Sequence, residues 1–244
     1  MLTDGPALLA NNLTKAFSGA LVLDALDLRL EQGENVVVIG PSGTGKSVLI
    51  KCLVRLMLPD AGDVLLLDKE LYGLNAKDLN KLRRQIGFLF QSAALYDSMS
   101  VRENVGFPLR HSIYAKKEQS RRVDRILDRV GLTAAADKMP AQLSGGMRKR
   151  VGLARTLILE PKLIFYDEPT TGLDPITALE ISRLIKSIQE EYGASSLIIT
   201  HDKVCTRITA DRVLVLKNGR FVANGTCDEL AAVKDEWISA FFAL

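Results

Sequence analysis

No stretch of the 244 residues contains the roughly 18 consecutive apolar side chains that a membrane-spanning helix requires. The N-terminal segment MLTDGPALLA also lacks the basic and long apolar regions of a secretion signal. These absences argue against an integral membrane protein and against a secreted one. We therefore expect a protein that is cytosolic or bound peripherally to a membrane.

Cysteine is scarce. Cys52, Cys205 and Cys227 are odd in number, and none of them shows the paired spacing that zinc sites use. The sequence therefore offers no disulfide framework and fits a reducing compartment. We interpret all three cysteines as small core residues.

An excess of charge of one sign is lacking as well. The 32 basic and 29 acidic residues leave a net charge of +3, so no overall field directs the chain toward nucleic acid or an anionic membrane. Hydrophobic residues make up 47% and charged residues 25%, which is typical of a folded globular protein and excludes a disordered one.

Three short apolar runs predict buried strands, at residues 36–39, 163–166 and 197–200. The first ends in glycine and is followed by a helical pattern from residue 45 to about 56. The other two are followed at once by charged residues. Because ligands gather at the carboxyl ends of strands in open α/β sheets, we expect the three strand ends to build one site.

The rest of the chain predicts three further units. Leucines that alternate with polar residues between 21 and 30 predict half-buried strands of an antiparallel sheet. Apolar residues recur at helical spacing between 123 and 130, and we interpret residues from about 92 to 155 as an inserted helical subdomain. Asn218-Gly219 lies between two apolar runs and predicts a β-hairpin.

Residues 40–47 read Gly-Pro-Ser-Gly-Thr-Gly-Lys-Ser and fit the pattern G-x-x-x-x-G-K-[ST] of a phosphate-binding loop (P-loop). In such a loop backbone N–H groups face the phosphates of ATP, the lysine reaches the β- and γ-oxygens, and the serine is a ligand of Mg²⁺. A merely flexible glycine loop is the alternative, and the position between a strand and a helix disfavours it. The predicted nucleotide contacts are Gly40, Pro41, Ser42, Gly43, Thr44, Gly45, Lys46 and Ser47.

Asp167 and Glu168 end the second apolar run. We assign Asp167 to the Mg²⁺ shell and Glu168 to the attacking water, because adjacent carboxylates point to opposite sides of an extended chain. A solvated acidic pair that opens a loop is the alternative.

Residues 143–147, Leu-Ser-Gly-Gly-Met, precede a helical pattern that runs to about residue 159. Ser144, Gly145 and Gly146 would then lie at a positively polarised helix N-terminus and form a second phosphate cradle. A plain N-cap, with Ser144 accepting a backbone N–H bond, is the alternative.

Together these motifs resemble those of the ATP-binding cassette (ABC) ATPases over nearly the whole chain. The resemblance implies an α/β fold: a P-loop NTPase core with an N-terminal antiparallel β subdomain and the helical subdomain at about 92–155, all in one domain of residues 1–244. The motifs that carry it occur in the family's order: residues 40–47, Gln91, 143–147, 163–168, 172–174 and His201.

The resemblance also implies a head-to-tail pair of identical chains, in which each ATP lies between the P-loop of one copy and Ser144 to Gly146 of the other. It makes Gln91 a sensor of Mg²⁺ and the γ-phosphate, and His201 a contact to the γ-phosphate and water. Asp174 would line the dimer contact and Phe17 would stack on adenine. The alternatives are a strand-end amide for Gln91, a surface imidazole for His201 and a core side chain for Phe17.

Within the family, Val48 and Met147 depart from the commonest pattern. With residues 45–50, 91–109 and 172–177 they resemble the ATPases of Mla/Mce-type phospholipid transporters. Near the α-phosphate, Val48 leaves only backbone contacts. Such a chain would work peripherally at the cytoplasmic face of the inner membrane, with permease subunits and an Mce-domain lipid-binding protein. Residues 93–96 and 107–109 are candidate walls of a permease groove, or else parts of the subdomain's own core.

Two other functions share the motor. An importer ATPase for a small solute has the same catalytic motifs and differs only in its partner. An ABC ATPase acting on nucleic acid would need long insertions or a second cassette, and this sequence has neither. The basic residues between 116 and 122 alternate with acidic ones, which is typical of a solvated helix face, so we expect no nucleic-acid partner.

Overall fold

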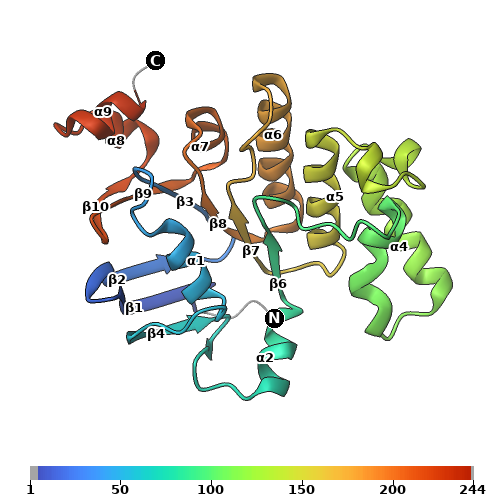
Figure 1. The fold of residues 1–244 in the computed structure, drawn as a ribbon, viewed down its shortest axis with the longest axis horizontal. Helices are drawn as coiled ribbons and strands as arrows, with labels where there is room; N and C mark the ends of the chain where they lie inside the picture. Colours follow the sequence, from blue (N-terminus) through green and yellow to red (C-terminus); the bar gives the residue numbers. More distant parts are fainter. Residues whose placement is uncertain (1–4, 243–244) are drawn as a thin grey trace.

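A six-stranded sheet forms the middle of the molecule in the computed structural model, which describes residues 5–242. The strand order is β10-β9-β3-β8-β7-β6, and the pairs from β9 to β6 are all parallel (Figure 1). The predicted hairpin at Asn218-Gly219 is confirmed, because β9 and β10 pair antiparallel across it. The strands are β3 (Asn35–Ile39), β6 (Ile86–Leu89), β7 (Leu163–Asp167), β8 (Ser195–Ile199), β9 (Arg212–Lys217) and β10 (Arg220–Gly225).

A second sheet, with the order β2-β1-β4-β5, is antiparallel. The alternating leucines predicted β2 but gave no sign of β1, because the register of β1 shifts at several places and Asn12 has a φ of 50°. A bulged strand loses the period of two that reveals a strand in a sequence. The strands are β1 (Leu8–Phe17), β2 (Ala20–Leu30), β4 (Ala61–Leu66) and β5 (Lys69–Glu70).

Helices connect the parallel strands, and the regular elements between residues 92 and 155 are all helical. α1 ends at Leu53 rather than at about residue 56, since Arg55 takes a left-handed φ of 54°. The helices are α1 (Lys46–Leu53), α2 (Ala76–Arg83), α3 (Val101–Gly106), α4 (Lys116–Arg129), α5 (Gly145–Leu157), α6 (Pro175–Tyr192), α7 (Lys203–Thr209), α8 (Cys227–Ala231) and α9 (Glu236–Phe242), with 3₁₀ turns η1 (Phe107–His111), η2 (Thr133–Ala135) and η3 (Pro140–Gln142).

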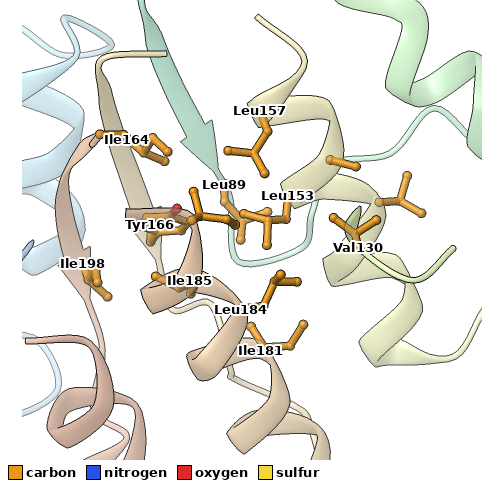
Figure 2. Close-up of a cluster of buried hydrophobic side chains, with 14 of the residues drawn as sticks. Leu89, Val130, Leu153, Leu157, Ile164, Tyr166, Ile181, Leu184, Ile185 and Ile198 are labelled. Carbon is orange, nitrogen blue, oxygen red and sulfur yellow. The ribbon is translucent and has the colours of Figure 1, made fainter. Parts of the chain in front are cut away.

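The parallel sheet separates two hydrophobic cores, and successive residues of each central strand contribute to opposite cores. Ile164 and Tyr166 of β7 pack against α5 and α6, whereas Leu163 and Phe165 pack toward α1 and the antiparallel sheet. Figure 2 shows the first core, where Leu153 of α5 lies among side chains from β6, β7 and α6. The strand ends that carry the site are thus held from both sides.

The C-terminal helix α9 packs on the domain, as the apolar face of this segment predicted. Ile238 and Phe242 are each 2% exposed, and the rings of Trp237 and Phe241 stack 5.7 Å apart against the core. Residues 243 and 244 of the predicted tail, like residues 1–4 of the predicted domain, lie outside the described residues. Each helix within 5–242 is too short or too polar to span a bilayer.

Two of the cysteines are core residues, as predicted. Cys52 and Cys205 are fully buried, and burial raises the pKa of both thiols to about 11. Cys227 begins α8 and is only partly buried, although it packs against the first core.

Candidate nucleotide site

The P-loop leaves the end of β3 and turns directly into α1, as the sequence predicts. Two of its glycines are required by the surrounding backbone. A Cβ atom on Gly40 would lie 2.1 Å from the carbonyl oxygen of Leu216, and one on Gly45 would lie 2.8 Å from the carbonyl oxygen of Val22. Gly45 also has a backbone φ of 98°, which residues other than glycine rarely adopt. The loop is therefore shaped by close approach to β2 and β9.

Lys46 begins α1 and lies back across the loop. Its Nζ donates to the carbonyl oxygens of Gly40, at 2.8 Å, and Pro41, at 2.9 Å. Burial lowers the pKa of this ammonium, while the carboxylates of Glu168 and Asp167 act in the opposite direction. A half-buried cation at the N-terminus of an α-helix, beside exposed loop N–H groups, is well suited to bind phosphate.

A pocket of about 400 Å³ opens beside the P-loop and brings three strand ends together. Most of the predicted contacts line it, whereas Gly40, Pro41 and Thr44 support the loop from behind. The Thr44 hydroxyl, for example, donates to the Pro41 carbonyl at 2.9 Å. Val22 and Ile199 line the pocket too, although the sequence did not single them out. The lining residues are Val22, Ser42, Gly43, Gly45, Lys46, Ser47, Val48, Gln91, Glu168, Ile199 and His201.

Asp167 ends β7 next to the pocket and fits a magnesium ion. Burial and the neighbouring Glu168 raise the pKa of Asp167, and the opposing effects of Lys51, Lys149 and Lys46 do not fully offset them. Mg²⁺ is usually held by one or two carboxylates together with phosphates and water. Consistent with that mode, no group of three His, Cys, Asp or Glu side chains forms a metal cage within residues 5–242.

Replacing Asp167 by asparagine is expected to stabilise the chain in the absence of nucleotide. A raised carboxyl pKa means that ionisation costs more in the folded chain than in the unfolded one. That cost is absent below the unfolded pKa of 3.8, grows as pH rises from there toward the folded pKa, and is fully present above the folded pKa. Asp167→Asn should therefore raise Tm at pH 7 in EDTA, and the difference should narrow toward about pH 4.

Thermal unfolding across this pH range is the measurement, and Asp137→Asn, at an exposed carboxylate, is the control. The same Asp167→Asn variant should lose Mg²⁺-dependent ATP turnover. A Tm below that of the wild type at pH 7 would contradict the electrostatic account.

Glu168 faces the pocket with its carboxylate held by two neighbours. Its Oε2 lies 2.8 Å from Nδ1 of His201 and accepts a hydrogen bond of 3.0 Å from the Thr171 hydroxyl. The side chain of Glu168 is only 14% exposed, whereas that of His201 is 66% exposed. A shielded carboxylate beside an accessible imidazole suits activation of a water molecule that enters from the open side.

The second cradle lies on another part of the surface. Ser144 caps α5 by accepting a hydrogen bond of 3.2 Å from the Met147 N–H, and Asp174 caps α6 in the same way. Ser144, Gly146 and Asp174 are absent from the lining of the P-loop pocket. Within one chain the serine thus acts as an N-cap, and Gly145 beside it lines a separate hollow of about 250 Å³ that Gln91 also borders.

Gly146 lies where α5 approaches α6 closely. A Cβ atom there would lie 2.4 Å from Cγ2 of Thr177, whose hydroxyl is fixed by a 2.6 Å hydrogen bond to Asp174. Gly146→Ala is therefore expected to lower the unfolding free energy by about 1–3 kcal/mol and to reduce ATP turnover by displacing the cradle. Urea denaturation and steady-state ATPase assays measure the two effects.

The matched test adds Thr177→Ser, which removes the clashing methyl group and keeps the hydroxyl that bonds Asp174. The double variant should recover most of both losses. If Thr177→Ser gives no recovery, the close approach is not the cause.

Phe17 lies at the end of β1 and is 44% exposed. The alternative of a core side chain is therefore wrong for it. The ammonium of Lys15 lies 5.6 Å from the centre of its ring. Because the ring is exposed, Phe17 remains a candidate for stacking on a base.

Two adjoining hollows, which we call the docking groove, run past the end of β6. They have volumes of about 220 and 420 Å³ and share Ile86, Phe88 and Phe90. Of the predicted wall residues, Ala94, Tyr96, Phe107 and Pro108 line the groove. Ala93 and Leu109 are 1% and 0% exposed and belong to the core, which was the alternative interpretation for these residues.

Comparison with known proteins identifies this arrangement. Residues 23–171, more than half of the chain, match the family model described as ABC transporter. The chain belongs to the ABC transporter family. It is the ATP-binding domain of that family, an ABC ATPase, and the predicted fold is confirmed by the solved cassettes that it resembles.

Several curated ABC proteins are similar to the chain. The methionine import ATP-binding protein MetN of Rhizobium johnstonii is 41% identical over 88% of the chain and 59% of its own length. The probable ribonucleotide transport ATP-binding protein mkl of Mycobacterium tuberculosis is 37% identical over 97% of the chain and 66% of its length. The chloroplastic protein TRIGALACTOSYLDIACYLGLYCEROL 3 of Arabidopsis thaliana is 40% identical over 93% of the chain and 70% of its length. The chain thus spans roughly 59–66% of the first two ABC proteins.

Two solved ABC structures are similar in fold. A dimeric post-hydrolysis state of the cassette MJ0796, bound to ADP and Pi, superposes with a TM-score of 0.82 and 32% identity, covering 90% of this chain and 98% of that one. CbiO1 of Clostridium perfringens, part of the transporter complex cbiONQ, gives a TM-score of 0.87 and 33% identity over 95% of this chain and 92% of its own.

Proposed function

We propose that the chain is the motor subunit of an ABC transporter that moves phospholipid between membranes, and that two copies close head-to-tail around two ATP molecules. In each site Ser47, Gln91 and Asp167 would hold Mg²⁺, Lys46 the phosphates, and Glu168 with His201 the attacking water. The second copy would contribute Ser144, Gly145, Gly146 and Asp174.

The separation of the two anion sites supports the shared site. The cradle at Ser144 has no lysine of its own and lies outside the P-loop pocket, so it fits a phosphate that another copy already holds. The MJ0796 cassette, 32% identical, is dimeric in its ADP- and Pi-bound state. An ATP sandwiched between two chains would meet donors from both sides.

The lipid substrate rests on the residues that depart from the common ABC pattern, Val48 and Met147, and on the stretch from 91 to 109. A relative that is 40% identical carries the name of a galactolipid, trigalactosyldiacylglycerol. The partners would be permease subunits and an Mce-domain lipid-binding protein, with the chain lying peripherally at the cytoplasmic face of the inner membrane.

Import of a small solute is the second candidate, and the 41% identity to a methionine import protein favours it. Purifying the chain with its membrane partner and identifying the bound small molecules by mass spectrometry separates the two. Phospholipid together with an Mce-domain subunit is the expected result. A complex that instead contains a periplasmic amino-acid- or sugar-binding protein would contradict lipid transport.

The docking groove supports a permease partner, because apolar side chains line it and stay exposed. Leu56 is 57% exposed and Phe90 is 38% exposed. A contiguous apolar hollow on a protein surface marks a binding site more often than scattered apolar residues do. A short apolar helix of the permease would fill such a groove.

Leu56→Glu is expected to leave the ATPase rate of the isolated chain within about twofold of the wild type and to reduce assembly with the permease about tenfold or more, since a buried unpaired charge is costly. Pull-down with the tagged permease measures assembly. The control is Val222→Glu on β10, 51% exposed and at the opposite edge of the parallel sheet from β6. Unchanged assembly with Leu56→Glu would place the permease elsewhere, and an equal loss in both variants would show that the groove is not specifically required.

A further inference from the structure

Helix α5 supports the segment of residues 88–94, which contains Gln91 and forms part of the docking groove. Thr156 donates to the Phe88 carbonyl at 3.1 Å, and Arg155 donates to the carbonyls of Ala93 at 2.7 Å and Ala94 at 2.8 Å. Ala93 and Ala94 both have left-handed backbones, with φ of 59° and 45°. Because such conformations persist only when their surroundings fix them, the segment takes its shape from α5.

Lys149, one turn into the same helix, contacts two separate segments of the main chain instead of one. Its Nζ donates to the carbonyl of Gln91 at 2.6 Å and also to the carbonyl of Glu168 at 2.9 Å. The side chain is 5% exposed, and burial lowers the pKa of its ammonium. Burying a cation is costly unless its hydrogen bonds offset the loss of water, so two main-chain carbonyls are a substantial part of its compensation.

The backbone of Glu168 needs such support. Its φ is 50°, a left-handed conformation that a residue other than glycine adopts at a cost. The Glu168 N–H donates to the Ile199 carbonyl at 2.8 Å, and its own carbonyl accepts from Lys149. The two peptide groups of the residue are therefore fixed from opposite sides, by β8 and by α5. The Thr171 N–H also donates to the Glu168 carbonyl, at 3.3 Å, so Lys149 supplies the shorter of the two hydrogen bonds to this oxygen. Loss of the Lys149 bond would leave the strained backbone with the longer one and would let the carboxylate shift from His201.

We propose that Lys149 is a positioning residue, whose ammonium fixes the main chains of Gln91 and Glu168 in one frame and so couples the groove segment to the catalytic carboxylate. The proposal rests on the function proposed above for Glu168. Lys149 touches neither nucleotide nor water in this role. It differs from Lys46, which lines the P-loop pocket and would bind the phosphates directly.

Two substitutions test this role in the purified chain with Mg²⁺ and ATP. Lys149→Met removes both hydrogen bonds and keeps the length of the side chain. Lys149→Gln is milder, since its amide can donate to one carbonyl, and it carries the test if the methionine variant unfolds. The control is Arg150→Met, the next cation on α5, whose guanidinium contacts Val130 and Glu180 and no residue of the pocket.

The expected result is a fall in kcat of about tenfold to a hundredfold for Lys149→Met and a smaller fall for Lys149→Gln, with KM for ATP changed less than about twofold. The single variant Glu168→Gln and the double variant Glu168→Gln with Lys149→Met should dimerise with ATP to the same extent. A merely structural role would lower dimerisation together with kcat.

Two results would overturn the proposal: kcat within about twofold of the wild type for both Lys149 variants, or losses of ATP binding and dimerisation that match the loss of kcat. A different result would show that the role proposed for Glu168 is itself wrong. In that case Glu168→Gln alone, with Lys149 intact, would hydrolyse ATP at the wild-type rate.

Discussion

Glu168→Gln is expected to reduce the rate of ATP hydrolysis by a factor of about 10²–10⁴ while leaving ATP affinity nearly unchanged. The amide has the same shape and retains an oxygen for the Thr171 hydroxyl, now 3.0 Å from Oε2, but it cannot take a proton from the attacking water. ATP that binds and is not hydrolysed should trap the closed pair. Single-turnover hydrolysis, equilibrium binding and light scattering measure the three quantities.

The control for this variant is Glu190→Gln, an equivalent change at an exposed position of α6. It should hydrolyse ATP and dimerise like the wild type. Hydrolysis by Glu168→Gln at the wild-type rate would show that another group activates the water. A fully active chain that stays monomeric at all concentrations would contradict the shared site.

Lys46→Ala is expected to abolish measurable turnover, with a fall of at least about 10³, and to weaken ATP binding by about tenfold or more. The variant removes an ammonium that lies across the P-loop, lines the pocket and interacts with the carboxylates of Asp167 and Glu168. Without it the phosphate charge meets two acidic groups with less compensation. Isothermal titration with Mg²⁺ and ATP, followed by a turnover assay, measures both losses.

Lys69→Ala, an exposed lysine in β5, is the matched control and should keep both properties. Because the Lys46 ammonium also ties together the carbonyls of Gly40 and Pro41, Tm should be recorded for the variant. Turnover above about one tenth of the wild-type rate would rule out the central role of this cation.

The sequence predicted the parts of the site that local geometry dictates. A strand that ends in Gly40 and a helix that begins at Lys46 leave little freedom for the loop between them. In the same way, Asp167 and His201 follow buried strands whose parallel pairing brings their ends to one edge. Such residues can be recognised in the sequence because their reactive side chains directly follow predicted strands.

Other contacts arise from the tertiary fold and leave no local signal. Val22 lies in an alternating strand, and only the packing of β2 on the P-loop brings it to the pocket. Lys149 reads as one of several basic residues on a helix, although it is nearly fully buried. One of the two hollows of the docking groove is lined by residues from the turn after α1, from β4, from α2 and from β6, which only the fold brings together.

Helix α5 serves two nucleotides in the proposed pair. Ser144 caps its N-terminus, where it would contact the ATP of the other copy, and Lys149, about one turn further along, is fixed to the Glu168 backbone of its own chain. Because a helix is rigid, a shift of Ser144 would also move Lys149. In a closed pair, the occupancy of each site would therefore set the position of the carboxylate in the other, and the two sites would act as one cooperative unit.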